Sequence, residues 1–392
     1  MFHSMNTILK NISDRLHTIY LVWLREFKLV FSDTGVLIFF FVLPTLYPLV
    51  YTFIYNPEVV RDIPVAVVDN SRSARSREFT RMADATEAIK IIGYASSLDE
   101  ARHWQNDKAC YGILVIPDDY DRKIGRGEQA TIIFYYEMSL LIRYRTLLSA
   151  LTDLSLATGT MIQQEQNGFT ISSPVNSSSV TLGDTSEGFA SFVIPGILVL
   201  IIQQSLILGI AMLGGGSNER RRLNLGIDPL AINASPVYSI LGKSLCYFVI
   251  YIPLVIYMLL FIPMFFNLPR IGSYLEILLF IVPMIFSSIF MGLTIQRFVS
   301  EREASMLIIV VTSVIFLFLS GLTWPRFAMS PMWQVIGGLI PATWGIEGFI
   351  RLNSNGASLS QNATPYMMLW ALTALYFTLA VFTHSKKTIP KI

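Results

Sequence analysis

The chain has 392 residues, of which 53% are hydrophobic and only 14% are charged, and its mean hydropathy is +0.54. This balance lies outside the usual range for soluble domains and excludes a chain whose apolar residues serve only to fill a core. The net charge of +2 conceals two regions of opposite balance, since residues 56–188 carry more acidic than basic residues while the rest of the chain is basic. The composition predicts an integral membrane protein with a separate polar domain, and so small a net charge gives no reason to expect a nucleic-acid partner.

The N-terminal region, residues 1–34, ends in an amphipathic segment. Residues 15–33 place apolar side chains on one stripe at helical spacing, with Arg25 and Lys28 among the polar positions. This pattern favours a helix that lies along the cytoplasmic interface, although it also fits the charged front of the first membrane span. That span is predicted at residues 35–55, and its direction is from inside to outside.

Residues 56–188 form the polar region, which we expect to be an extracytoplasmic α/β domain followed by a linker. Short β-type runs alternate with helical patterns, and Ser71 is a plausible N-cap for the first helix. Residues 167–188 are rich in Ser, Thr, Gly and Asn and read as the linker. The expected strands are 63–68, 88–94, 111–116 and 130–135, and the expected helices are 71–84, 98–106 and 138–164.

The remainder, residues 189–392, contains five more apolar runs long enough to cross a hydrocarbon layer of about 30 Å. Between the first two of these runs lies a polar loop, residues 214–236, which carries three adjacent arginines. Short basic loops stay in the cytoplasm, so this loop and both termini are predicted to be cytoplasmic. The expected spans are 189–213, 237–266, 274–296, 304–322 and 366–384, followed by Lys386, Lys387 and Lys391.

Residues 323–350 are too polar and too rich in proline for a normal span, yet too apolar for a free loop. Their tryptophans prefer the membrane interface, and their prolines divide the segment into short pieces. External re-entrant helices fit this pattern best, and the alternative is an external loop that packs on the membrane domain.

The arrangement resembles the ABC-2-type permeases of ATP-binding-cassette exporters, which have the type V exporter fold. The resemblance covers nearly the whole chain. It rests on the amphipathic helix and first span, the external domain that opens with IPVAVVDNSRSARSREF and continues with YGILVIPDDYDRKIGRGEQATIIFYYE, and the ERRR loop. It continues with SPVYSILGKSLCY and SGLTWPRFAMSPMWQVIGGLIPATWGIEGFIR.

The resemblance implies a permease subunit that moves a drug, a lipid or another amphipathic molecule outward and performs no covalent chemistry itself. ATP and Mg²⁺ would be bound by a separate cytoplasmic ATPase, and no cofactor by this chain. A second permease, identical or related, would face it among membrane lipids. The subgroup with a large domain between the first two spans is similar to bacterial inner-membrane permeases that work with a periplasmic adaptor and an outer-membrane channel.

Residues for coupling to the ATPase are expected in the amphipathic helix and the arginine loop, where polar side chains and a short turn offer contacts. The alternative is that the arginines only fix topology or meet anionic lipid, each with an effect of about 1 kcal/mol near the surface. The candidates are Arg25, Glu26, Lys28, Glu219, Arg220, Arg221, Arg222, Asp228 and Pro229.

Polar residues in or near the spans are the candidates for a substrate path. An amide within a span must find a partner or water, so Gln203 and Gln204 either make interhelical hydrogen bonds or line the path. Glu276 and Glu347 would touch a substrate or brace nearby arginines. The full set of path candidates is Gln203, Gln204, Glu276, Trp324 and Glu347.

Other chemistries find little support in the sequence. LGKS at residues 241–244 lacks the first glycine of a phosphate-binding loop and runs into a membrane helix. The four histidines are scattered, and the aspartates at 118, 119 and 121 lack the spacing of a calcium loop, so neither a catalytic nor a metal site is expected. A second hypothesis is a membrane-anchored sensor or assembly factor whose external domain binds a ligand or protein, but a single anchor would suffice for that role.

Overall fold

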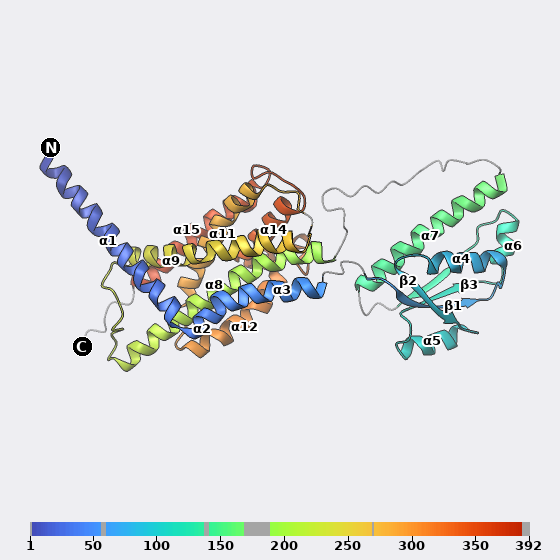
Figure 1. The fold of residues 1–392 in the computed structure, drawn as a ribbon, viewed down its shortest axis with the longest axis horizontal. Coiled ribbons are helices and arrows are strands. Elements are labelled where there is room, and N and C mark those ends of the chain that lie inside the picture. The colour runs from blue at the N-terminus through green and yellow to red at the C-terminus, as the bar shows by residue number, and fades with distance from the viewer. Residues whose placement is uncertain (1, 56–59, 137–140, 168–188, 269, 386–392) are drawn as a thin grey trace. The chain divides into compact units, whose positions relative to one another are not determined.

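The computed structural model describes residues 2–55, 60–136, 141–167, 189–268 and 270–385. The chain divides into two compact units, which are described separately. One comprises residues 1–58 and 181–392 and is helical, and the other comprises residues 59–180 and is an α/β unit (Figure 1). The linker predicted at 167–188 and the lysines predicted to follow the last span lie almost wholly outside the described residues.

Long apolar helices make up most of the helical unit. Six segments among the described residues are long and apolar enough to cross a membrane, in agreement with the prediction of a polytopic helical membrane protein. They are Thr34–Tyr55, Val193–Leu223, Pro236–Phe265, Tyr274–Ile295, Arg302–Leu319 and Ala363–Ser385.

The N-terminal helix α1 (Phe2–Ser32) is longer than the predicted segment 15–33. Its apolar stripe carries a ladder of aromatic rings in which Trp23 stacks on Phe27. The helix stops at Asp33, whose carboxylate accepts hydrogen bonds from the backbone N–H groups of Gly35 and Val36 and so caps α2 (Thr34–Leu37). The first span continues through a π-helical turn (Ile38–Val42) into α3 (Leu43–Tyr55).

Helix α8 (Phe189–Leu223) lies at the centre of the unit, because 89% of its most apolar stretch is buried by other helices. It packs against α3, α11 (Tyr274–Ile295), α12 (Arg302–Leu319) and α14 (Pro341–Asn353). Helix α9 (Pro236–Ile256) packs along α1 and continues through a π-helical turn (Tyr257–Phe261) into α10 (Ile262–Phe265). The last helix, α15 (Ala363–Ser385), packs on α11.

The prediction of a loop at residues 214–236 is wrong for residues 214–223, because α8 remains helical to Leu223. Three consecutive glycines lower helix propensity, but tertiary packing overrides it here. A Cβ at Gly214 would lie 2.6 Å from Cβ of Gln296, and one at Gly215 would lie 2.7 Å from the backbone of Glu301. The glycines therefore let the turn between α11 and α12 lie directly against α8, and only the stretch after Leu223 is a loop.

The segment predicted to be re-entrant forms two short helices. They are α13 (Pro331–Gly338) and α14 (Pro341–Asn353), bent by 89° at the break between them, as in a broken span or a re-entrant loop. A 3₁₀ turn (Arg326–Ala328) precedes them.

The α/β unit is built on a four-stranded sheet in the order β2-β1-β3-β4. Strand β1 is parallel to β2 and β3, and β4 is antiparallel to β3. Helices α4 and α7 share one apolar core with the sheet, while α5 belongs to a second core that includes alternate residues of β1. The strands are β1 (Ile63–Asp69), β2 (Ile89–Tyr94), β3 (Gly112–Ile116) and β4 (Ile133–Tyr136), and the helices are α4 (Ala74–Asp84), α5 (Leu98–Asn106), α6 (Tyr120–Gly125) and α7 (Leu141–Asn167).

Local details of this unit depart from the sequence prediction. The N-cap of α4 is Ser73, whose hydroxyl accepts from the N–H of Ser76, and not Ser71. Two of the aspartates that lack the spacing of a calcium loop are ion-paired, Asp119 with Lys123 and Asp121 with Arg75. Cys110 of this unit and Cys246 of the helical unit are both free and buried.

Candidate functional site

Asp228 is a buried carboxylate in the loop between α8 and α9, with a side chain only 1% exposed. Its oxygens accept hydrogen bonds from Nε of Arg220 at 3.0 Å, Nη2 of Arg25 at 3.2 Å, Oγ of Ser217 at 2.7 Å and the N–H of Leu230 at 3.1 Å. These donors come from α8, α1 and the loop itself. One side chain therefore fastens the loop to two helices. We call the surrounding region, residues 25–35, 214–243 and 296–303, the Asp228 end of the helical unit.

The electrostatic balance at Asp228 favours the ionised form. Burial by itself would raise the pKa of this carboxyl, but the hydrogen bonds from Arg220, Ser217 and the N–H of Leu230 outweigh burial and lower the pKa to about 2. Asp228 is thus an anion throughout the neutral range, and its charge is held by arginines of the same chain.

A second buried carboxylate, Glu26, joins α1 to α9. It accepts a hydrogen bond from the hydroxyl of Tyr247 and lies 3.6 Å from Nζ of Lys243. Arg25, the partner of Asp228, also lies 3.4 Å from Glu26. The two carboxylates are therefore linked through Arg25. The helices can approach this closely because Gly242 has no side chain, and a Cβ there would lie 2.7 Å from the carbonyl oxygen of Ile19.

Arg302, the first residue of α12, joins that helix to two others. Its Nη1 lies 2.7 Å from Asp33 at the start of α2, and Nε lies 3.5 Å from Glu219 of α8. The backbone N–H of Arg302 donates to the same glutamate at 2.7 Å. A more exposed pair, Arg222 with Glu301, adds a second connection between α8 and α12.

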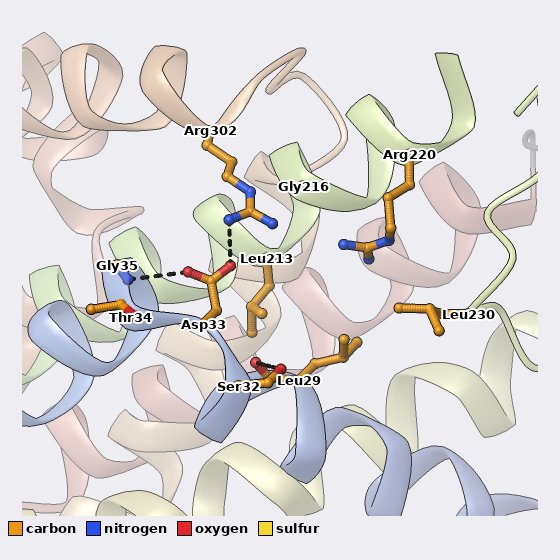
Figure 2. Close-up of a pocket in the computed structure, with 10 residues that line it drawn as sticks. All are labelled: Leu29, Ser32, Asp33, Thr34, Gly35, Leu213, Gly216, Arg220, Leu230 and Arg302. Atoms are coloured by element: carbon orange, nitrogen blue, oxygen red, sulfur yellow. Dashed lines mark hydrogen bonds and ion pairs between the residues drawn. The ribbon is translucent and has the colours of Figure 1, made fainter. Parts of the chain in front are cut away.

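A cavity of about 440 Å³ opens beside these groups, at the break between α1 and α2. Figure 2 shows the guanidinium groups of Arg220 and Arg302 pointing into it from different helices, with Asp33 near its middle. The lining residues are Leu29, Ser32, Asp33, Thr34, Gly35, Leu213, Gly216, Arg220, Leu230 and Arg302.

The structure brings five of the nine coupling candidates into the buried networks, and a sixth, Arg222, makes the exposed ion pair with Glu301. Asp228 and Glu26 are buried, so they brace helices within the chain and offer no surface for a partner to grip. Arg222, Lys28 and Pro229 are exposed, while Arg221 is half-buried. The networked candidates are Arg25, Glu26, Glu219, Arg220 and Asp228.

Sequence reasoning missed Ser217, Arg302, Lys243 and Tyr247, each of which contacts a predicted candidate, and Asp33, which contacts Arg302. A signal was present for two of them. Asp33 stands directly before a helical pattern, where a capping carboxylate is common, and Lys243 is a charge within an apolar run, which requires a partner. The remaining three carry no local signal.

The path candidates fall into two places. Gln203 is fully buried, and its Oε1 accepts from the N–H of Ala342 at 2.5 Å, so it satisfies a backbone donor at the start of α14. The side-chain nitrogens of Gln203 and Gln204 have no hydrogen-bond partner among the described residues. The structure thus supports the interhelical hydrogen bond for Gln203. Gln204 remains a candidate for the substrate path.

At the opposite end of α8, Glu347 of α14 lies 3.0 Å from Nη1 of Arg326 and 2.6 Å from Nη2 of Arg351. Glu347 therefore braces two arginines, one of the two roles expected for it. Trp324 is 58% exposed, and Glu276 is half-buried in the first turn of α11.

Comparison with known proteins gives one family match. A family model described as "ABC-2 family transporter protein" matches residues 34–382, which is most of the chain and includes both units. No match was found among the curated proteins. Within the described residues, no group of three or more histidine, cysteine, aspartate or glutamate side chains is placed to hold a metal ion.

Proposed function

The chain belongs to the ABC-2 transporter family, and from that premise we propose that it is the permease subunit of an exporter. It moves a drug, a lipid or another amphipathic molecule outward across a bacterial inner membrane. A separate cytoplasmic ATPase binds ATP and Mg²⁺ and supplies the energy, and a second permease completes the transport path.

The orientation in this proposal follows from charge. Arginines and lysines gather at the Asp228 end, in α1, the end of α8 and the start of α12. Basic residues near span ends favour the cytoplasmic side, so this end faces the cytoplasm and the α/β unit lies outside. Both termini are then cytoplasmic.

The observation that carries the coupling role is an exposed apolar loop held on a buried anchor. Leu225 is 99% exposed and Ile227 is 71% exposed, yet Asp228, the next residue, is almost fully buried among arginines. Exposed apolar side chains on a short, fixed element are typical of a surface that binds another protein. We name residues 223–230 the apolar loop and assign it to ATPase docking.

Force transmission follows from the ion pairs behind the loop. A push on the apolar loop reaches α1 and α8 through Asp228, α9 through Arg25 and Glu26, and α12 through Glu219 and Arg302. Packed elements with two discrete arrangements move together when such contacts hold them, so closure of the ATPases would change the packing of several spans at once. Gln203, Gln204, Glu276, Trp324 and Glu347 remain the candidates for the path that opens.

The experiment is co-purification of a tagged permease with its ATPase in mild detergent. Leu225→Asp and Ile227→Asp place a charge on the apolar loop without touching a buried contact, and each should reduce ATPase recovery and substrate-stimulated ATP hydrolysis at least tenfold. Phe327→Asp is the matched control, because Phe327 is 87% exposed but lies in the turn before α13, far along the chain from the loop. Normal ATPase recovery and export in both loop variants would refute the docking assignment.

The external partners are part of the same proposal and rest on the family alone. A periplasmic adaptor and an outer-membrane channel would receive the substrate from the α/β unit. Affinity purification from cross-linked cells, with deletion of residues 60–167 as the comparison, tests this. Recovery of the same envelope proteins with and without the α/β unit would refute its role as their docking site.

A further inference from the structure

The cavity at the Asp228 end has a hydrogen-bonding imbalance that the ion-pair networks leave unresolved. Arg302 uses Nη1 on Asp33 and holds Nε 3.5 Å from the Glu219 carboxylate, and Arg220 uses Nε and Nη2 on Asp228, so Nη2 of Arg302 and Nη1 of Arg220 make none of these contacts. A guanidinium carries five N–H donors in a fixed fork. Both arginines therefore keep donors that are directed into the cavity (Figure 2).

The carboxylate that lines the cavity is already occupied. Oδ1 of Asp33 accepts from the N–H groups of Gly35 and Val36, and Oδ2 is paired with Arg302. Each remaining guanidinium N–H group needs an acceptor, so the remaining capacity of the cavity is for a ligand that accepts hydrogen bonds. Two arginine forks from different helices match the several oxygens of a phosphate group better than a single neutral acceptor.

The position and walls of the cavity add a second constraint. It lies where α1 meets the first candidate span and where α8 and α12 leave their apolar stretches. The ends of apolar spans meet the headgroup layer when such helices cross a bilayer. Leu29, Leu213 and Leu230 supply apolar wall beside the arginines. Basic pockets between spans are known to hold anionic headgroups. At about 440 Å³ the space exceeds what one phosphate fills, leaving room for attached glycerol carbons.

We propose that this cavity binds a phosphate group, clamped between Arg220 and Arg302, and that the group is carried either by an anionic phospholipid or by a free phosphate compound. Binding would occupy the donors that the protein leaves unpaired. The bound phosphate would also connect α8 to α12 beside Asp33. It would therefore strengthen the packing of the first span against α8 and α12.

The test uses the full-length protein in dodecyl maltoside and measures two responses, the apparent Tm and lipid retention by native mass spectrometry. Phosphatidylglycerol is compared with diacylglycerol of the same chains, which lacks the phosphate, and inorganic phosphate is titrated separately. Wild type should retain phosphatidylglycerol and gain thermal stability, with little response to diacylglycerol. Protection by inorganic phosphate alone would instead identify a free phosphate compound as the natural source.

Three variants and one control assign the response to the cavity. Arg302→Gln removes a fork, Arg302→Lys keeps the charge facing Asp33 but loses the fork, and Leu230→Trp fills the cavity from its exposed side. Each should weaken phosphate-dependent retention about tenfold. Arg222→Gln removes a charge at the same end outside the cavity, and it should respond as wild type does. If Arg302→Gln fails to fold, the other two variants still decide. Equal retention in Leu230→Trp, Arg302→Lys and wild type, or no response of wild type to either phosphate probe, would overturn the proposal.

Discussion

Replacement of Asp228 by asparagine should destabilise the helical unit by about 3 kcal/mol. The pKa of this carboxyl is about 2, and a depression of nearly two units below the usual aspartate value corresponds to about 2.5 kcal/mol. Asparagine keeps the shape but not the charge, so Arg25 and Arg220 lose a partner while only 18% and 23% exposed. Breaking a buried ion pair from one side costs about 3–5 kcal/mol in general, and the partial exposure of the arginines places this case at the low end.

The sign of the pH dependence follows from the direction of the shift. A carboxyl whose pKa is lower in the folded state stabilises that state above its unfolded pKa of about 4, and the stabilisation is lost as the pH falls through the folded pKa of about 2. The difference in apparent Tm between wild type and Asp228→Asn should therefore be full at pH 7 and close to zero below pH 2. Thermal unfolding in detergent, followed by tryptophan fluorescence at a series of pH values, measures this difference.

A control and a double-mutant cycle separate this ion pair from general charge effects. Glu301→Gln breaks the ion pair with Arg222. Because the side chains of Glu301 and Arg222 are 54% and 60% exposed, this change should lower the free energy of unfolding by about 0.5 kcal/mol or less. The double variant Asp228→Asn, Arg220→Gln should lose much less stability than the sum of its single changes, because the two residues share one interaction. Strict additivity, or an Asp228→Asn protein that melts with wild type at neutral pH, would refute the reasoning.

Other predictions follow from packing, unit boundaries and orientation. Gly242→Ala should lower the Tm, since the new Cβ meets the backbone of α1 at 2.7 Å, at a cost of about 1–3 kcal/mol; Gly159→Ala, with nothing within 4 Å, is the control and should be neutral or stabilising. A fragment of residues 59–167 should fold alone, because it has its own cores, and circular dichroism without a cooperative melt would contradict this. With an impermeant thiol reagent on sealed cells, Asn355→Cys should be labelled and Asn224→Cys should not, against a low background because the native cysteines are buried; labelling of position 224 would reverse the orientation.

The sequence by itself determined the elements of this protein. Hydrophobic length identified the spans, because a helix must be about twenty apolar residues long to cross a bilayer whatever its neighbours are. Period-2 and period-3.6 patterns located the four strands and the helices α4, α5 and α7 to within a few residues, because these patterns depend on backbone geometry alone. The short helix α6 was not predicted, since six residues are too few to show a period. The positive charge of short loops predicted an orientation from the sequence alone, because it acts on each loop separately and needs no tertiary contact.

Only the tertiary structure decided what the charged residues do. Residues 214–216 read as a loop from local propensity, and they are helical because residues 296–302 pack on the bare glycine backbone. Asp228 reads as a surface group, and it is buried because α1, about 200 residues away along the chain, supplies Arg25. Glu26 of α1 is buried because α9 supplies Tyr247 and Lys243. Gln203 was ambiguous until the start of α14 was found beside it. In each case a partner distant in sequence determines whether burying the residue is favourable, and no local pattern encodes which distant residue will be brought near.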